Sequence, residues 1–504
     1  MRLTLIVAAL TVLATAVVAA EAATLKFRYG VAAGEVTSTS AVLWTRAPGP
    51  GQVLLAYGPT NEVEGVVLRY LKPRRVNDLT LQPRITGLRP GTKYVYRFWW
   101  GKRTNASGTF VTAPRPRANA RVRFAISGDA DATPTASGGL AFNRFQIYAR
   151  MAAERNDFNI NLGDTIYSDS GVGGAPAART TTEKWGKYKL ALALPALRTL
   201  RASTGLYSHW DDHEFVDDFS RSEHGSAIYA AGVKAFRDYS PVAYSRELGL
   251  YRSVRWGKHL ELFFLDERSF RSAKATSACG NDLAPTAPQL VRDAFASLAP
   301  GLRNPVPPAC LAAINDPART LLGARQYAAF TSAIKASNAT WKVVVNEVPI
   351  QQYYALPYDR WEGYDAERDR LLRFLQANVK NVVFLTTDTH GNLINEVRFR
   401  TFGAVPEGSG MWEAVAGPVA TNTFAKEIDQ FLGTPGAGTA IGALFFKPPP
   451  PSGLGMRCAA LDVYSYAQVT VTARTLTVAP RDVKGNPVRE ATGVACTPLV
   501  LTAR

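Results

Sequence analysis

Polar side chains that can bind metal ions follow five apolar segments in the second part of the chain. Each segment has the length and composition of a buried strand, and the polar groups come directly after it. They are Asp129 with Asp131, Asp164 with Tyr167, the run 211–214, Asn346 with Glu347, and Asp388 with His390. Because ligands of open α/β sheets bind beyond the carboxyl ends of the strands, these side chains can line one cleft. The sequence therefore predicts a single polar site.

The crowding of carboxylates predicts that this site binds metal. Carboxylates held close together repel one another and bind protons unless a cation compensates their charge. Two cations about 3.5 to 4 Å apart can hold a phosphoryl group and lower the pKa of a bound water. An acidic residue at one strand end is most often a turn former or a helix cap. Five such ends in succession favour a metal centre.

Histidine is scarce, so most ligands must be oxygen atoms. Among the five histidines, His213 and His390 lie inside acidic motifs. We interpret His209 as a neighbour of the site, and His224 and His259 as surface residues. Carboxylate, amide and phenolate ligands suit Ca²⁺, Fe³⁺, Mg²⁺ or Mn²⁺ better than they suit zinc.

Apolar strands alternate with helical patterns in the part of the chain that carries these motifs. The expected strands are 122–127, 158–162, 205–210, 260–265, 342–345 and 382–386, and the expected helices are 142–155, 229–237, 324–337 and 366–376. This order predicts an α/β (α+β) layered domain at 121–504. Residues 403–455 are rich in Gly and Pro and are predicted to be irregular covering loops, followed by closing strands at 463–472 and 476–479.

The first part of the chain has a different pattern, of short alternating strands separated by turns. The expected strands are 41–46, 52–57, 78–83, 93–100 and 108–112. With no helical stretch among them, residues 24–113 are predicted to form an all-β sandwich of the immunoglobulin or fibronectin type. Residues 114–120 are the expected linker, because prolines at 114 and 116 cannot join a sheet interior.

The N-terminus and the cysteines indicate export. Residues 1–22 combine an apolar run with an Ala-x-Ala pattern and are predicted to be a signal peptide; an uncleaved anchor is the alternative, because the run is about as long as the shortest spanning helices. We expect a secreted protein, periplasmic or extracellular, with no transmembrane anchor after cleavage. In such a protein the four cysteines are predicted to pair as 279 with 310 and 458 with 496.

The net charge of +17 favours anionic partners. The basic residues are scattered rather than clustered, so a solubilising surface is the alternative explanation. We expect a monomer with no specific nucleic-acid partner.

The motifs resemble those of the calcineurin-like metallophosphatases, and among them the PhoD family of alkaline phosphatases. Trp-Asp-Asp-His-Glu at 210–214 is that family's form of the histidine motif. The matching segments also include 29–34, 42–46, 163–167, 266–271 and 387–390. Each piece alone is weak, but the combination is specific.

The resemblance implies roles for the metal ligands. Asp164 would bridge two metals, Tyr167 would bind ferric iron through its phenolate, and Asp212 would be the ligand from the 210–214 motif. Asp388 and His390 would complete the metal shell. Asn346 or Glu347 would supply a further ligand, and the sequence does not decide between them.

Two residues are expected to act on the phosphate. By resemblance, His213 would face the phosphate and protonate the leaving group. Arg268 is a candidate phosphate clamp, because a guanidinium matches phosphoryl oxygens. A structural ion pair with a nearby acid is an equal alternative for Arg268.

The first motif departs from the family. PhoD enzymes usually have Ser-Cys-Gln after the first strand, whereas this chain has Ser127-Gly128-Asp129. Asp129 is the candidate to replace the cysteine ligand, and Asp131 is the reserve. A carboxylate is a harder ligand than a thiolate, although Tyr167 still favours iron. The expected cofactors are Fe³⁺ and Ca²⁺, with Mn²⁺, Mg²⁺ or Zn²⁺ as alternatives.

The predicted function is therefore a metal-dependent phosphoric-ester hydrolase that releases phosphate from phosphomonoesters by attack of metal-bound hydroxide. The family also includes phosphodiesterases of phospholipase D-like specificity, which is the first alternative. A non-catalytic protein that binds envelope polyanions is the second. The expected partners are small phosphate esters, or phospholipid and polyanionic phosphodiesters, and the loops 168–182 and 403–455 would select among them.

Overall fold

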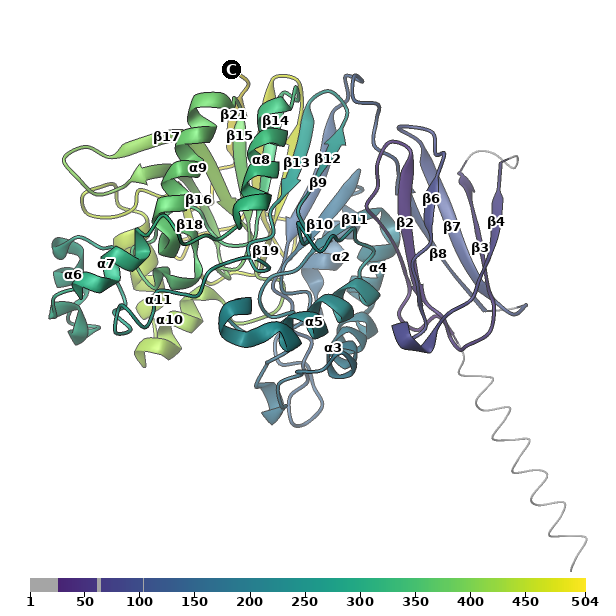
Figure 1. Ribbon diagram of the computed structural model, residues 1–504, viewed down its shortest axis with the longest axis horizontal. Helices are drawn as coiled ribbons and strands as arrows, with labels where there is room; N and C mark the ends of the chain where they lie inside the picture. The colour runs from purple at the N-terminus through teal and green to yellow at the C-terminus, as the bar shows by residue number, and fades with distance from the viewer. Residues whose placement is uncertain (1–25, 61–64, 103) are drawn as a thin grey trace, which may run out of the picture.

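The computed structural model describes residues 26–60, 65–102 and 104–504 (Figure 1). The expected signal peptide, residues 1–22, lies outside the described residues. Within these three ranges, no helix is at once long enough and apolar enough to cross a membrane.

Three β-sheets form the framework of the molecule. The first contains β1 (Val31–Gly34), β2 (Ser40–Arg46), β5 (Thr80–Leu81), β6 (Arg84–Thr86), β9 (Val122–Ser127), β10 (Phe158–Leu162), β11 (Gly205–His209), β19 (Ser465–Val471), β20 (Thr475–Asp482) and β21 (Leu499–Thr502). The second contains β12 (Arg252–Trp256), β13 (Leu260–Phe264), β14 (Trp341–Asn346), β15 (Val382–Thr386), β16 (Asn392–Arg400), β17 (Glu407–Val415) and β18 (Cys458–Ala460). The third contains β3 (Val53–Pro59), β4 (Val67–Leu71), β7 (Lys93–Trp100) and β8 (Thr104–Val111).

The strand order places several carboxyl ends side by side. The first sheet runs β21-β20-β19-β9-β10-β11-β1-β2-β5 with β6 beside β2, and the second runs β12-β13-β14-β15-β17-β16-β18. In the first sheet β9, β10 and β11 are parallel neighbours, and in the second β13, β14, β15 and β17 are. Each sheet therefore presents a row of carboxyl ends at one edge, where ligands of parallel sheets bind.

The two large sheets pack face to face, and helices cover their outer faces. In β9, Phe124 and Ile126 point into the core between the sheets, whereas Ala125 packs against the outer helices. The helices over the first sheet are α2 (Gln146–Ala153), α3 (Thr181–Ala193), α4 (Pro195–Ser203) and α5 (Arg221–Tyr239), and those over the second are α8 (Ala324–Ala336) and α9 (Asp365–Asn378). Strands covered on both faces are mostly apolar, as in β15, which reads Val-Val-Phe-Leu-Thr. The predicted layered α/β fold is confirmed.

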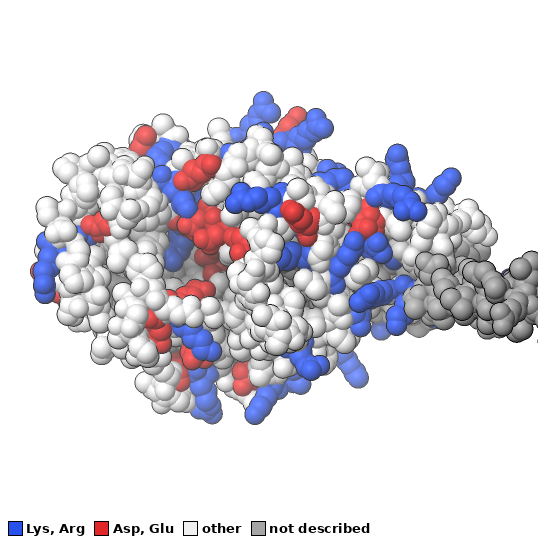
Figure 2. Space-filling model, turned by 90° about the horizontal axis from the view of Figure 1, so that it is seen from below, with Lys and Arg blue, Asp and Glu red and all other residues white. Residues whose placement is uncertain are grey.

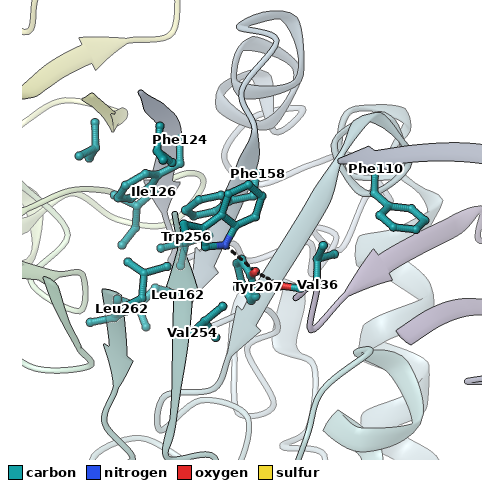
Figure 3. Packing of buried hydrophobic residues seen from close by; sticks show 14 of the residues in the cluster. Val36, Phe110, Phe124, Ile126, Phe158, Leu162, Tyr207, Val254, Trp256 and Leu262 are labelled. Carbon is teal, nitrogen blue, oxygen red and sulfur yellow. Dashed lines mark hydrogen bonds between the residues drawn. The ribbon is translucent and has the colours of Figure 1, made fainter. Parts of the chain in front are cut away.

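Tyr207 on β11 links the core to the N-terminal part of the chain (Figure 3). Its hydroxyl accepts a hydrogen bond of 2.8 Å from the indole N–H of Trp256 on β12 and donates one to the carbonyl of Val36. The Trp256 ring also packs on Phe158, with the ring centroids 4.5 Å apart. Because both hydrogen bonds of the Tyr207 hydroxyl are made, burying this polar group costs little free energy. The burial of the aromatic rings then stabilises the packing of the two sheets.

The predicted N-terminal β-sandwich is confirmed, and one of its sheets continues into the large domain. The third sheet packs on β1, β2, β5 and β6 through buried residues such as Leu55, Tyr96 and Phe110. β1 also pairs in parallel with β11, at Ala33 and Gly205. This pairing satisfies backbone groups of a strand that is buried along its whole length. Residues 114–120, the expected linker, contain turns and no helix or strand.

The prediction of irregular loops at 403–455 is wrong. This region contains β17, a central strand of the second sheet, and the helices α10 (Phe424–Leu432) and α11 (Ala437–Ile441), followed by a π-helical turn, Gly442–Phe446. The glycines of β17 favoured the prediction of loops, because glycine usually weakens a strand. At Gly410 the φ angle is 74°, a left-handed conformation that glycine adopts without strain, so the strand favours glycine at that position.

Two disulfides form as predicted. Cys279 pairs with Cys310, and Cys458 pairs with Cys496. The first closes the region of α6 (Gln289–Phe295), a 3-10 turn η3 (Pro300–Arg303) and α7 (Pro308–Ile314).

Candidate metal centre

Strand ends from both large sheets meet at one place. The hydroxyl of Thr387, directly after β15, donates a hydrogen bond of 3.0 Å to the carbonyl of Leu162 at the end of β10. The backbone N–H of Asp388 donates to the Oδ1 of Asp129, which follows β9, at 3.3 Å. These bonds join the edge of one sheet to the edge of the other and bring the acidic turns together.

The turn after β9 requires glycine at position 128. A Cβ on Gly128 would lie only 1.8 Å from the carbonyl oxygen of Leu162. The backbone N–H of Ala130 then donates to the carbonyl of Asp164 at 2.9 Å. Glycine therefore permits the close approach that places Asp129 beside Asp164.

Four of the predicted ligand residues have left-handed backbone conformations. The φ angles are 62° at Asp129, 43° at Asp164, 65° at Asp388 and 55° at His390. A non-glycine residue in this region costs about 1 to 3 kcal/mol, which the surrounding structure must offset. Such strain gathers at functional sites, and here it coincides with the predicted ligands.

The acidic and histidine side chains form overlapping groups. In each group the ligand atoms all lie within 4.8 Å of one another. The groups are Asp129 with Asp164 and His390, Asp164 with Asp212 and His213, and Asp211 with Asp212 and Asp388. Asp164 belongs to two of these groups, and so does Asp212, which also forms a group with Asp217 and Asp218. Each of the two carboxylates can therefore serve two neighbouring cations.

Tyr167 adds an oxygen to the first of these groups. Its hydroxyl lies 2.9 Å from the Nε2 of His390. Its ring stacks on His213, with the ring centroids 4.1 Å apart. The phenol is therefore a fourth potential ligand beside Asp129, Asp164 and His390.

The chemistry of these groups fits hard metal ions. The Oδ2 atoms of Asp129 and Asp211 are buried and have no hydrogen-bond partner among the described residues. Burial raises the pKa of Asp129 to about 7, although His390 opposes the shift. Burial also raises the pKa of Asp211 to about 6, against the effect of Arg268. Carboxylates in this state take up protons unless a cation compensates them, and oxygen-rich ligand sets suit Ca²⁺, Mg²⁺, Mn²⁺ or Fe³⁺.

One face of the molecule carries an acidic hollow. Figure 2 shows Asp and Glu side chains gathered in a hollow near the middle of this face, with Lys and Arg side chains mainly around it. The site residue Asp388 has 21% of its side chain exposed, so the centre is open to solvent. A concave acidic site on a protein of net charge +17 can bind cations while the overall field attracts an anionic ligand.

His213 is oriented by Asp169. The Nδ1 of His213 lies 2.6 Å from the Oδ1 of Asp169, and the backbone N–H of His213 donates to Asp164 at 3.1 Å. Burial alone would lower the pKa of His213, but the carboxylates of Asp164 and Asp212 raise it well above its usual value. With Nδ1 bonded to Asp169, Nε2 is the nitrogen that can face a ligand.

His390 is oriented by helix α10. Its Nδ1 lies 2.6 Å from the Oε1 of Glu427, and its carbonyl accepts a hydrogen bond of 2.9 Å from the backbone N–H of Phe424. A carboxylate behind a ligand histidine fixes the ring and raises its basicity. Helix α10, which the sequence did not predict, is thus part of the support of the centre.

Arg268 is fully buried among the carboxylates. Its guanidinium bonds to Asp211 and, at 2.8 and 2.7 Å, to the two carboxylate oxygens of Asp359. Its Nη2 also lies 3.4 Å from Asp212 and from Asp388. Of the two roles that the sequence left open for Arg268, these contacts favour the structural ion pair over the phosphate clamp.

Asn346 and Glu347 lie next to each other in buried polar contacts. The amide of Asn346 donates to the carbonyl of Val348 at 2.6 Å. The Oε2 of Glu347 accepts a bond of 2.6 Å from the backbone N–H of Glu267, and its Oε1 lies 3.0 Å from the Nδ1 of His209. Glu347 is in none of the acid and histidine groups formed by the described residues.

Asp129, and not Asp131, joins the ligand groups. The Oδ1 of Asp131 accepts from the backbone N–H of Thr133 at 2.7 Å, and its Oδ2 accepts from the hydroxyl of Ser170 at 2.5 Å. Both oxygens of the reserve ligand are therefore engaged elsewhere.

Sequence reasoning missed several acidic residues of the site. Asp211 lies in the recognised run 211–214, two residues after the end of β11, but it was given no role of its own. Asp169 lies two residues after Tyr167, which was a weak signal. Asp359 and Glu427 come from segments with no motif, and only the tertiary structure brings them to Arg268 and His390.

The comparisons with known proteins agree with this geometry. The model of the PhoD-like phosphatase family matches residues 134–441, and the model of the PhoD-like phosphatase N-terminal domain matches residues 12–114. Neither range includes the turn 127–131, where this chain departs from the family pattern.

The chain is also similar to individual known proteins, over different shares of their lengths. Alkaline phosphatase D of Bacillus subtilis (strain 168) is 25% identical over 416 residues, which are 73% of this chain and 64% of that protein. The structure of PhoD superposes with a TM-score of 0.72 at 20% identity, over 95% of this chain and 89% of the other. A purple acid phosphatase from seeds of yellow lupin (Lupinus luteus) has a TM-score of 0.58 at 13% identity, over 94% of this chain and 74% of the other. These similarities and the two family matches show that the chain belongs to the PhoD-like phosphatase family.

Proposed function

We propose that the chain is a metal-dependent phosphoric-ester hydrolase that releases phosphate from phosphomonoesters. The observation that carries the proposal is the position of Asp164, whose carboxylate is shared by the group with Asp129 and His390 and the group with Asp212 and His213. A shared carboxylate between two donor groups is what a pair of neighbouring cations needs. Two such cations would supply an activated water and neutralise the charge of a phosphoryl group.

The proposed metal ligands divide into two sets, one for each cation. We assign Asp164 as the bridging carboxylate, with Asp129, Tyr167 and His390 on one side and Asp212 and Asp388 on the other. Tyr167 and the oxygen-rich ligands favour Fe³⁺ on the first side and Ca²⁺ on the second, with Mn²⁺, Mg²⁺ or Zn²⁺ as alternatives. Asn346 and Glu347 are retained as candidates for a further ligand.

His213 is assigned to proton transfer. Asp169 fixes its imidazole through Nδ1 at 2.6 Å, so Nε2 can donate a proton to the oxygen of the departing alcohol. The bond to Asp169, which is not among the proposed ligands, supports the protonated form of the imidazole. Arg268 balances the negative charge of Asp211 and Asp359 and positions them.

The proposed function includes a cellular location and an oligomeric state. The predicted signal peptide and the two disulfides support secretion to an oxidising compartment. We propose that the mature protein acts there as a monomer on phosphate esters of small molecules.

Hydrolysis tests the proposal directly. The metal-reconstituted protein should release phosphate from p-nitrophenyl phosphate at neutral or alkaline pH. Loss of a residue that only supports a ligand typically costs about 10- to 100-fold in activity. Asp164→Asn removes a proposed bridging ligand itself, so it should lower kcat/KM by more than about 100-fold. Asp369→Asn, a change in a surface ion pair of α9, is the matched control and should leave the rate unchanged.

The alternatives are outcomes of the same assay. Faster turnover of bis(p-nitrophenyl) phosphate than of the monoester would favour the phosphodiesterase. No turnover of either ester by protein with full metal content would contradict the enzyme and favour a polyanion-binding protein.

A further inference from the structure

An apolar cavity opens beside the candidate metal centre. Its volume is about 350 Å³, which is in the range of small-molecule sites. Helices α6, α10 and α11, the turn η3 and the segment 353–356 contribute its walls. All but three of the lining residues are apolar or aromatic.

Helix α10 turns an apolar stripe toward this cavity. Phe424, Ile428, Phe431 and Leu432 line it, and their spacing of three to four residues places them on one face of the helix. In the whole of α10 only Ala425 is buried. The apolar face of the helix is therefore covered incompletely by the protein itself.

Helix α10 separates the cavity from the metal centre and contacts both. Glu427 lines the cavity, and its Oε1 lies 2.6 Å from the Nδ1 of His390. Phe424 lines the cavity as well, and its backbone N–H donates to the carbonyl of His390. The cavity therefore lies directly behind His390, one side chain away from the candidate ligands.

The charged residues of the lining already have partners inside the protein. Arg292 bonds to the carboxylate of Asp282 at 2.8 and 2.9 Å. Arg360 donates to the carbonyl of Leu356 at 2.9 Å. Glu427 is engaged with His390. A sugar or a peptide would lose its bonds to water here with little compensation, whereas a hydrocarbon chain would gain by leaving water.

The entrance of the cavity is also apolar. Leu298, Leu356 and Phe431 line it and are 39%, 43% and 59% exposed. Exposed apolar side chains that surround a cavity mark a binding site more often than single exposed residues do.

We propose that this cavity is a subsite for the hydrocarbon chain of a single-chain amphiphile whose phosphate ester reacts at the metal centre. The substrate role rests on the proposed function. The reaction is ordinary hydrolysis: the oxygen of water bonds to phosphorus, the bond from phosphorus to the alkyl oxygen breaks, and the alcohol leaves with a proton from His213. The subsite adds selection for chain length.

A series of alkyl phosphates tests the subsite. With metal-loaded protein and substrates below their micelle-forming concentrations, kcat/KM should rise on the order of 10- to 100-fold from butyl to octyl phosphate, because each buried methylene contributes up to about fourfold. Dodecyl phosphate should give little further gain once the cavity is full. A fluorescent amphiphile that cannot be hydrolysed, dansyl-undecanoic acid, should bind saturably to the same protein.

Substitutions in the cavity test whether the dependence on chain length arises there. Phe431→Asp places a charge at the entrance and Ala299→Trp fills part of the cavity, and each should lower the octyl-to-butyl ratio at least about tenfold. Leu444→Asp is the matched control, because Leu444 belongs to the same region, is 71% exposed and is not among the lining residues. It should keep the ratio of the unmodified protein.

The outcomes separate the two proposals. Equal rates across the series without probe binding would overturn the subsite and leave the proposed function standing. No hydrolysis of any ester would overturn the proposed function and the substrate role, whatever the probe does. Chain-length dependence that requires phosphatidylglycerol vesicles and is lost equally in Leu444→Asp would overturn the subsite in favour of membrane docking. A dimer that Phe431→Asp dissociates would identify a second copy of the chain as the occupant.

Discussion

The Nδ1 of His213 lies 2.6 Å from the Oδ1 of Asp169, and the Oδ2 of the same carboxylate accepts a bond of 2.6 Å from the backbone N–H of Asp217. Asp169 therefore connects the turn after β10 to the turn after β11. It fixes the plane of the imidazole and leaves Nε2 as the nitrogen for proton transfer. Two predictions test this arrangement.

His213→Ala should slow the hydrolysis of an alkyl phosphate by about 10² to 10⁴-fold, the usual range for a general acid. An aryl phosphate with a good leaving group needs less protonation, so its rate should fall less. Metal content, measured by elemental analysis, should stay nearly unchanged. Equal losses for both substrates together with loss of metal would identify His213 as a ligand instead.

Asp169→Asn should slow alkyl phosphate hydrolysis by about 10- to 100-fold, because it weakens the support of an imidazole that remains in place. The rate should also depend more steeply on the pKa of the leaving group, since the proton donor is less well oriented. Asp369→Asn, in a surface ion pair of α9, is the control, with little effect expected. The same leaving-group dependence in Asp169→Asn and in the unmodified protein would contradict the positioning role.

The strands of the site could be predicted from sequence because they are buried on both faces. β9, β10 and β15 have the predicted bounds, since each is a short run rich in apolar residues that a polar turn with an acidic residue follows. The acidic residues that follow these strands were recognised for the same reason.

What could not be predicted depends on tertiary contacts. β17 contains Gly410, whose left-handed φ of 74° cannot be read from the sequence. Glu427 lies on a helix in a region read as loops, and nothing near it in sequence connects it with His390. The parallel pairing of β1 with β11 joins segments far apart in the chain, which local patterns do not encode.

The position of the first ligand is tested by a pair of variants. Asp129→Ala should lower the occupancy of one metal together with activity, because Asp129 lies in a ligand group with a buried oxygen that has no partner among the described residues. Asp131→Ala should keep both metals, since its carboxylate bonds to Thr133 and Ser170. Elemental analysis and phosphate release measure the two effects. The reverse result would move the ligand by two residues along the turn.

Metal removal should destabilise the fold as well as abolish activity. A metal that binds only the native state stabilises it by about 4 kcal/mol at a free concentration 1,000 times its Kd. With an unfolding entropy of about 2.1 cal/mol/K per residue, chelation should therefore lower the thermal unfolding midpoint by about 5 °C for each metal lost. Restored metal should recover both the midpoint and the activity. Asp164→Asn should respond much less to the chelator, and an equal response would place the stabilising metal elsewhere.

Removal of Arg268 separates its two possible roles. Arg268→Ala would leave the buried carboxylates of Asp211 and Asp359 without their cation, and breaking a buried ion pair costs about 3 to 5 kcal/mol. The midpoint of urea unfolding should fall accordingly. Arg373→Ala removes an ion pair in which both side chains are about half exposed, and it should change stability by less than about 1 kcal/mol. A phosphate clamp predicts the opposite pattern for Arg268→Ala, with stability retained and KM for the phosphate ester raised. Because the guanidinium is fully buried and bonded to carboxylates, we expect the loss of stability.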